Sequence, residues 1–107
     1  MSRKPKSEEL FRVLCLVGIL QPTSAKDIAS QISKVKKLPG PVDLKVTEIQ
    51  AVIDVLMKSN LIHSQRQGIV LTQEGDHMIK RFGLGPLRDR NRFFFLKTMQ
   101  KESTIQH

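Results

Sequence analysis

The stretch LIHSQRQGIVLTQEG, residues 61–75, constrains the fold of this chain more than any other. Two short apolar runs flank a polar tip at residues 64–68, and such runs can pair as short antiparallel strands. Gly68 supplies the positive φ that a tight turn needs. Thr72 follows the second strand and can cap a helix over residues 73–82. The inward side chains of that helix should be Met78, Ile79 and Phe82.

Two longer segments carry apolar residues at helical spacing. The first begins near Ser7, whose hydroxyl can cap it, and is apolar on so many sides that it should be largely buried. Cys15 lies within it and should be a core residue rather than a reactive thiol. The second begins with a capping box at residues 47–50 and ends at Asn60, which tolerates the left-handed conformation. The core residues should be Leu10, Val13, Leu14 and Val17 in the first segment, and Ile49, Val52, Ile53, Leu56 and Met57 in the second.

A short helix and an irregular connection separate these segments. Ser24 can cap a helix that carries Ile28 and Ile32, a pattern typical of the first helix of a helix-turn-helix. The sequence SKVKKLPGPVDLK, residues 33–45, follows, and no helix can run through its Pro-Gly-Pro. A tight helix-turn-helix joins its helices with roughly three or four residues, so this basic connection is longer than that unless the preceding helix continues to about Lys37.

The charge balance points to polyanionic partners. The chain has 107 residues, enough for one small domain, with 18 Lys plus Arg against 10 Asp plus Glu and a net charge of +8. This excess is typical of nucleic-acid binding, although basic proteins also bind acidic partners or anionic membranes. Residues 1–6 predict a disordered basic arm, either a solubilising tail or a DNA contact. No apolar run is long enough to span a membrane, and one cysteine fits a reducing compartment, so we expect a soluble cytoplasmic, nucleoid-associated or nuclear protein.

The run VIDVLMKSNLIHSQRQGIVLTQEGDHMI resembles winged helix-turn-helix transcription regulators of the MarR-like and PadR-like kind. In these proteins a recognition helix ends in a leucine, a few charged residues, a turn residue and Leu-Ile, and a wing then leads into Leu-Thr-x-x-Gly at the start of a helix. The matching residues here are Leu56, Lys58, Asn60, Leu61-Ile62, the tip from Gln65 to Gly68, and Leu71-Thr72-Gln73-Glu74-Gly75.

The resemblance, which covers roughly residues 7–82, implies a mainly α fold with a small β-hairpin and a winged helix-turn-helix domain over residues 7–84. The helical spacing of the tail adds a C-terminal helix over 85–107. It also implies binding to double-stranded DNA as a homodimeric transcriptional regulator. The recognition helix, about residues 47–59, would enter the major groove, and the wing tip, residues 64–68, would contact the backbone or minor groove. The residues expected to contact DNA are Lys34, Lys36, Lys37, Lys45, Thr47, Gln50, Ala51, Gln65, Arg66 and Gln67.

Other features favour a different partner. Ala51 stands where related regulators often carry arginine, and Glu48 and Asp54 place negative charge on the outward side of the recognition helix. A carboxylate can accept a hydrogen bond from cytosine, but it also repels phosphate. The alternative is therefore a winged-helix protein-interaction module in a transcription, replication or DNA-segregation assembly.

The C-terminal segment carries more apolar surface than one face of a small domain absorbs. Phe93-Phe94-Phe95-Leu96 places large side chains all round the predicted helix. We expect this segment to pair two copies of the chain or to dock another protein; the alternative is that it packs back across the first helix. The residues assigned to dimerisation are Leu87, Phe93, Phe94, Phe95 and Met99.

The sequence does not predict an enzyme or a cofactor. His63, His77 and His107 have no cysteine or carboxylate at metal-ligand spacing, so we expect no metal site. The segment around Gly83 and Gly85 lacks the spacing and the lysine of a phosphate-binding loop. No nucleophile stands beside a base, and we therefore expect no catalytic residues.

Overall fold

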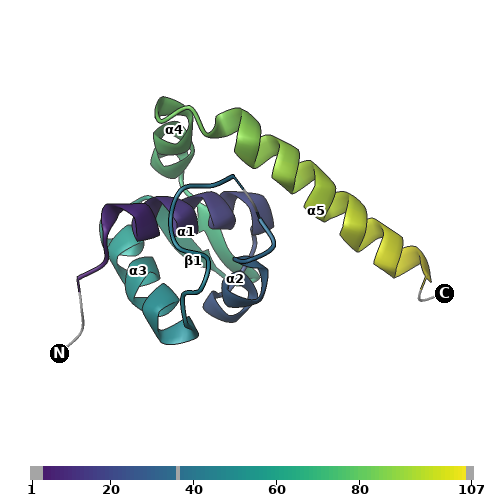
Figure 1. The fold of residues 1–107 in the computed structure, drawn as a ribbon, viewed down its shortest axis with the longest axis horizontal. Coiled ribbons are helices and arrows are strands. Elements are labelled where there is room, and N and C mark those ends of the chain that lie inside the picture. The colour runs from purple at the N-terminus through teal and green to yellow at the C-terminus, as the bar shows by residue number, and fades with distance from the viewer. Residues whose placement is uncertain (1–3, 36, 106–107) are drawn as a thin grey trace.

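The computed structural model describes residues 4–35 and 37–105, with side chains as far as residue 101. It is mainly α with a small antiparallel hairpin, as predicted (Figure 1). No helix in these described ranges is both long and apolar enough to cross a membrane. The elements in chain order are α1 (Ser7–Leu20), α2 (Ala25–Gln31), α3 (Val46–Lys58), β1 (Ile62–Gln65), β2 (Gly68–Leu71), α4 (Gln73–Arg81) and α5 (Gly85–Ile105).

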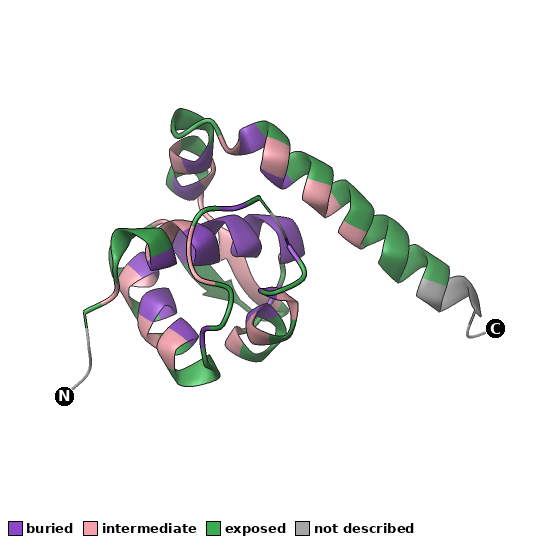
Figure 2. Cartoon of the chain, in the orientation of Figure 1, coloured by how far each residue is buried: buried purple, intermediate pink, exposed green. Residues whose placement is uncertain are grey.

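Helix α1 is the centre of the molecule. All four other helices and β2 pack against it, and it is buried continuously from Arg12 to Leu20 (Figure 2). A helix buried on every side needs apolar residues outside a single stripe, which the run from Val13 to Leu20 provides. Cys15 is fully buried, as predicted. The core around α1 is completed by Ile28, Ile32, Val35, Leu38, Leu44, Ile49, Val52, Ile53, Leu56, Ile62 and Ile79.

Helices α1 and α3 begin earlier than the capping hydroxyls predicted. Their N-caps are Lys6 and Lys45, so Ser7 and Thr47 lie inside the first turn. A carboxylate completes each cap, because Glu9 Oε1 accepts from the Lys6 amide at 3.2 Å and Glu48 Oε1 accepts from the Lys45 amide at 3.0 Å. The N3 glutamate thus determines where these helices begin.

Three other predicted helix ends are confirmed. Ser24 Oγ accepts from the Asp27 amide at 3.2 Å at the start of α2, and Thr72 Oγ1 accepts from the Gly75 amide at 3.0 Å at the start of α4. Asn60 has a φ of 60° after α3. Gly75 lies so close to the Leu61 carbonyl oxygen that a Cβ would clash with it.

The long connection from α2 to α3 is organised by one buried cation. Arg12 of α1 is 1% exposed. Its guanidinium donates to three carbonyl oxygens of the connection, at 2.6 Å to Ile32, 2.6 Å to Val35 and 2.8 Å to Leu38. These bonds satisfy backbone oxygens that have no helix or strand to pair with, and they hold the loop across α1.

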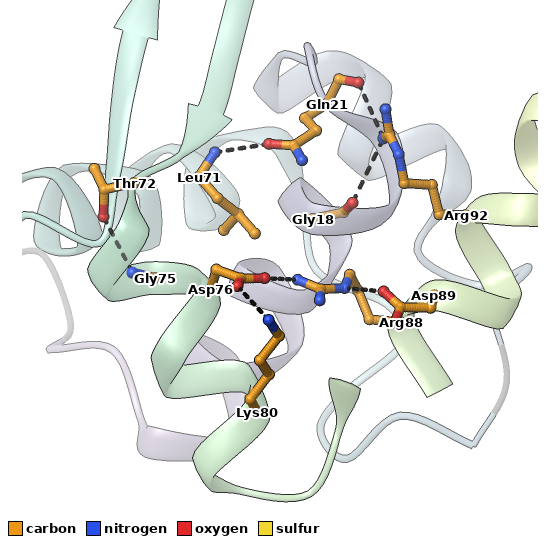
Figure 3. Close-up of polar contacts among 10 residues, drawn as sticks. All are labelled: Gly18, Gln21, Leu71, Thr72, Gly75, Asp76, Lys80, Arg88, Asp89 and Arg92. Carbon is orange, nitrogen blue, oxygen red and sulfur yellow. Dashed lines mark hydrogen bonds and ion pairs between the residues drawn. The ribbon is translucent and has the colours of Figure 1, made fainter. Parts of the chain in front are cut away.

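Helix α5 is attached to the body by two further arginines (Figure 3). Arg92 Nη1 donates to the carbonyl oxygens of Ile19 at 3.0 Å and Gln21 at 3.1 Å, which α1 leaves unpaired at its C-terminal end. Arg88 donates to Asp76 Oδ1, 2.6 Å away on α4. Hydrogen bonds from Lys80 and from Arg88 outweigh burial and lower the pKa of Asp76. The N-terminal half of α5 thus packs back on α1 and α4.

One apolar prediction, that Phe82 faces inward, is wrong. Phe82 is 54% exposed rather than inward, because α4 ends at Arg81 and the ring lies against the edge of Phe11, with centroids 4.4 Å apart. Helix α5 extends beyond the body after Phe95, and residues 96–101 are all exposed (Figures 1 and 2).

Replacing Arg12 with methionine should lower the free energy of unfolding by about 3 kcal/mol, because three loop carbonyls lose their donor. Urea unfolding followed by far-ultraviolet circular dichroism measures this, since the chain has no tryptophan or tyrosine. The matched control is Arg90→Met at an exposed position. Equal stabilities of the two variants would contradict the role of Arg12.

Burial raises the pKa of the Cys15 thiol from its ordinary 9.0 to about 11. The unfolded chain therefore loses this proton first, and the stability that the buried thiol contributes is complete below about pH 9 and is lost as the pH rises toward 11. Over that range wild type should lose up to about 2 to 3 kcal/mol more than Cys15→Ala. Parallel alkaline stability curves for the two proteins would show that Cys15 is not responsible.

Candidate nucleic-acid interface

Helix α3 turns its apolar residues inward and a polar face outward. Ile49, Val52, Ile53 and Leu56 are buried as predicted, and Met57 is half-buried. Of the residues predicted to contact DNA, Lys45, Thr47 and Gln50 are exposed, and Ala51 is half-buried.

The outward face of α3 carries both positively and negatively charged side chains. Gln50 donates from Nε2 to Asp54 Oδ1 at 3.1 Å, one helical turn further on. Glu48 is half-buried and is engaged by the backbone amide of Lys45. The amide of Gln50 retains a second proton and its own oxygen, so it still offers a donor and an acceptor.

The hairpin presents a two-residue turn. Gln65 at the end of β1 pairs with Gly68 at the start of β2, so Arg66 and Gln67 form the turn between them, as predicted, and both are exposed. Gln65 is exposed as well, with its Nε2 at 3.5 Å from His63 Nε2. This turn therefore displays one guanidinium between two carboxamides.

The hairpin is held from the side by the link between α1 and α2. Thr23 and Ile69 exchange two backbone hydrogen bonds, of 3.0 and 2.8 Å. Gln21 Oε1 accepts from the Leu71 amide at 2.9 Å (Figure 3). Gly68 has a φ of 141°, and a Cβ there would lie 2.8 Å from the Thr23 carbonyl oxygen. The turn is thus fixed to the body of the protein.

The loop lysines face outward because their neighbours face inward. Val35 and Leu38 are buried, whereas Lys34 and Lys37 are exposed. Lys37 has a φ of 71°, which turns the chain sharply at this point. Lys36, also predicted to contact DNA, lies outside the described residues.

The predicted DNA-contacting residues fall into two groups. The loop lysines lie on the segment that leads into Lys45 and the N-terminus of α3. The hairpin turn lies beside Pro22 and Thr23, which lead into α2. Because α2 packs against α3, the body of the protein links the two groups.

The residues predicted for dimerisation fall into a half-buried group and an exposed group. Leu87 and Phe95 are half-buried against the core of the same chain. Phe93 and Phe94 are 60% and 59% exposed, and Met99 is exposed too. Met99 and Leu96 line a groove of about 460 Å³ between α5 and the start of α2, together with Leu20 and Pro22.

Sequence reasoning missed the polar residues that position this interface: Arg12, Gln21, Thr23, Arg88 and Arg92. Arg12 had a detectable signal, because an arginine in a helix that is apolar all round has no solvent side to reach. Gln21 and Thr23 had none, since a polar residue in a short link reads equally well as a surface residue.

Comparisons with protein-family models, with curated proteins and with solved structures found no match for this chain. Its function is therefore argued from its own residues and their arrangement.

Substitution of Gly68 by alanine should destabilise the protein more than the same change at Gly83. Both glycines have positive φ, which costs an alanine about 1 kcal/mol in the left-handed region of Gly83 and at least as much at the larger φ of Gly68. A Cβ at Gly83 meets nothing within 4 Å, whereas one at Gly68 collides with Thr23, so we expect a loss of roughly 3 kcal/mol there. Thermal unfolding of the two variants tests this, and equal losses would mean that the hairpin is not tightly held.

Proposed function

We propose that this protein binds double-stranded DNA as a winged helix protein. The observation that carries the proposal is the hairpin turn, in which exposed Arg66 and Gln67 are held on a body-anchored pair of strands. In this arrangement the turn lies on the phosphate backbone or in the minor groove while α3 enters the major groove.

The charges around α3 support the backbone contacts. Lys34, Lys37 and Lys45 are exposed on the segment that precedes and begins the helix, and the whole chain carries a net charge of +8. Lysine and arginine at such positions neutralise phosphates and release counterions. These contacts provide affinity and orientation rather than sequence preference.

In this proposal, residues in the middle of α3 recognise the bases. The carboxamide of Gln50 can pair with adenine through one donor and one acceptor. Asp54, already bonded to Gln50, can accept from the amino group of cytosine. Thr47 lies one turn closer to the N-terminus and can approach either base or backbone. This set favours modest sequence preference within a binding mode dominated by phosphate contacts.

A homodimer is part of the same proposal. Two copies would place two α3 helices on half-sites about one DNA turn apart, roughly 34 Å. The apolar groove bordered by Leu96 and Met99 offers a surface for a second copy, continuous with the exposed end of α5. This makes the protein a candidate transcriptional regulator, acting in the nucleoid or nucleus.

The second candidate function is protein binding through α3. It is favoured by the carboxylates of Glu48 and Asp54 on the outward side of the helix, which would oppose phosphate. Here the cations of the loop and turn would bind an acidic surface of an assembly partner.

Fluorescence anisotropy of a labelled mixed-sequence duplex, titrated across a salt series, tests the proposal. For wild type we expect the logarithm of the affinity to fall steeply with the logarithm of salt concentration. Arg66→Ala should reduce the slope by about 0.9, and Lys34→Ala/Lys37→Ala by up to about 1.8, because each phosphate contact contributes about 0.9.

Lys58→Ala is the matched control, since this exposed lysine ends α3 on the side away from the loop. Its slope should equal that of wild type. If the salt slope fell as much in Lys58→Ala as in Arg66→Ala, binding would depend on the total charge of the protein and not on contacts made by the turn. No duplex binding at low salt would reject DNA binding and favour the protein-binding candidate.

A further inference from the structure

The exposed side of α5 carries a row of cations and aromatic rings that the proposed contact with duplex DNA does not use. Its members recur at spacings of three and four residues, which places them on one side of the helix. We call this row the α5 stripe, and it consists of Arg90, Phe93, Phe94, Lys97 and Lys101, all exposed.

The two rings of the stripe are open to solvent, and a cation lies over one of them. They meet edge to face, with centroids 5.9 Å apart and an interplanar angle of 71°. Lys97 Nζ lies 5.4 Å from the centroid of Phe93. Phe94, Lys97 and Lys101 also line a hollow on this side of α5. Flat apolar faces and positive charge are therefore available at the same place.

No carboxylate balances the stripe within residues 85–101, whose side chains are described. The acid in this part of α5, Asp89, is outside the stripe and accepts from Arg88 Nε at 2.8 Å. A second copy of the chain laid along the stripe would place its own Arg90, Lys97 and Lys101 close to the same three residues of the first copy, and like charges repel. The stripe thus calls for a partner that is negatively charged.

The rings determine which anionic partner fits. Leu96 and Met99, the exposed aliphatic side chains nearby, line the groove on another side of α5, so the stripe offers no aliphatic pocket to the side chains of an acidic peptide. Single-stranded nucleic acid combines regular negative charge with flat bases that stack on aromatic side chains without sequence preference. Duplex DNA keeps its bases stacked inside and cannot use the rings.

We propose that the α5 stripe binds single-stranded nucleic acid, with bases stacked on Phe93 and Phe94 and phosphates bound by Arg90, Lys97 and Lys101. The site is separate from α3 and the hairpin turn, so it does not depend on duplex binding. It gives the protein a second contact for strands that are already unpaired, such as those at a melted duplex end.

The test compares a labelled oligothymidylate with an abasic strand of the same length, which has the same phosphates but no bases. Wild-type protein should bind the thymidylate strand at least about fivefold more tightly per stacked ring. In Phe93→Ala/Phe94→Ala this preference should disappear while binding of the abasic strand is unchanged. Both rings are exposed, so circular dichroism should confirm that the variant is folded.

Two further variants separate this proposal from the preceding one. Arg66→Ala should keep the preference for bases, and Phe93→Ala/Phe94→Ala should keep duplex binding. Lys97→Gln/Lys101→Gln should weaken both single strands alike. Proton NMR gives a direct readout, because Phe and His are the only aromatic residues in the chain, and stacking should move the Phe93 and Phe94 ring signals upfield.

Equal affinity of wild type for the base-bearing and abasic strands would overturn the proposal, because the stripe would then act through charge alone. Full competition by polyglutamate at equal charge concentration would overturn it in favour of an acidic protein partner. Loss of the preference in Arg66→Ala but not in the phenylalanine variant would place the single strand on the hairpin turn instead.

Discussion

The arrangement of this protein depends on a single buried guanidinium. Arg12 lies in the most apolar helix of the chain and has no carboxylate partner among its hydrogen bonds; it donates instead to three loop carbonyl oxygens. Burial lowers the pKa of Arg12, and Cys15 acts in the opposite direction, but arginine keeps its charge in proteins. Leaving this charge buried is costly. This cost is offset by the ordered course of the connection across α1, whose described residues form neither helix nor strand.

Arginine side chains fulfil the same function elsewhere in the fold. Arg92 binds the carbonyl oxygens at the end of α1, and Arg88 links α5 to Asp76 on α4. In each case a long side chain from one helix satisfies polar groups on a different element. Because such bonds have fixed geometry, they set the angle at which α5 leaves the body, which apolar packing alone specifies less sharply.

Local signals allowed the elements to be predicted from the sequence, whereas the contacts that assemble them are nonlocal. The turn at residues 66–67, the caps at Ser24 and Thr72 and the left-handed Asn60 depend on neighbours within a few residues, and all were predicted correctly. The starts of α1 and α3 were misplaced, because a serine or threonine near the helix start hides the glutamate that completes the cap.

The sequence allowed the residues of the candidate site to be predicted, but not the contacts that hold them in place. Exposure of Arg66, Gln67 and the loop lysines follows from polar residues between apolar ones. The attachment of the hairpin to Thr23 was not predictable, because it joins segments more than forty residues apart through backbone atoms, which carry no sequence signature. Phe95 differs from Phe93 and Phe94 only in its direction from α5, and that direction is set by how α5 meets α1.

The way in which the loop is held has a consequence for how the sequence of this protein can change. Arg12 binds backbone oxygens, so the loop keeps its course through its buried apolar positions, Val35, Leu38 and Leu44, and through Gly40, where a Cβ would clash with the Glu8 carbonyl oxygen. Lys37 and Asp43, which lie between these positions, are exposed. Mutation can therefore add, remove or reverse charge along this loop while the fold stays intact, and the preference of the protein for its partners can drift independently of its stability.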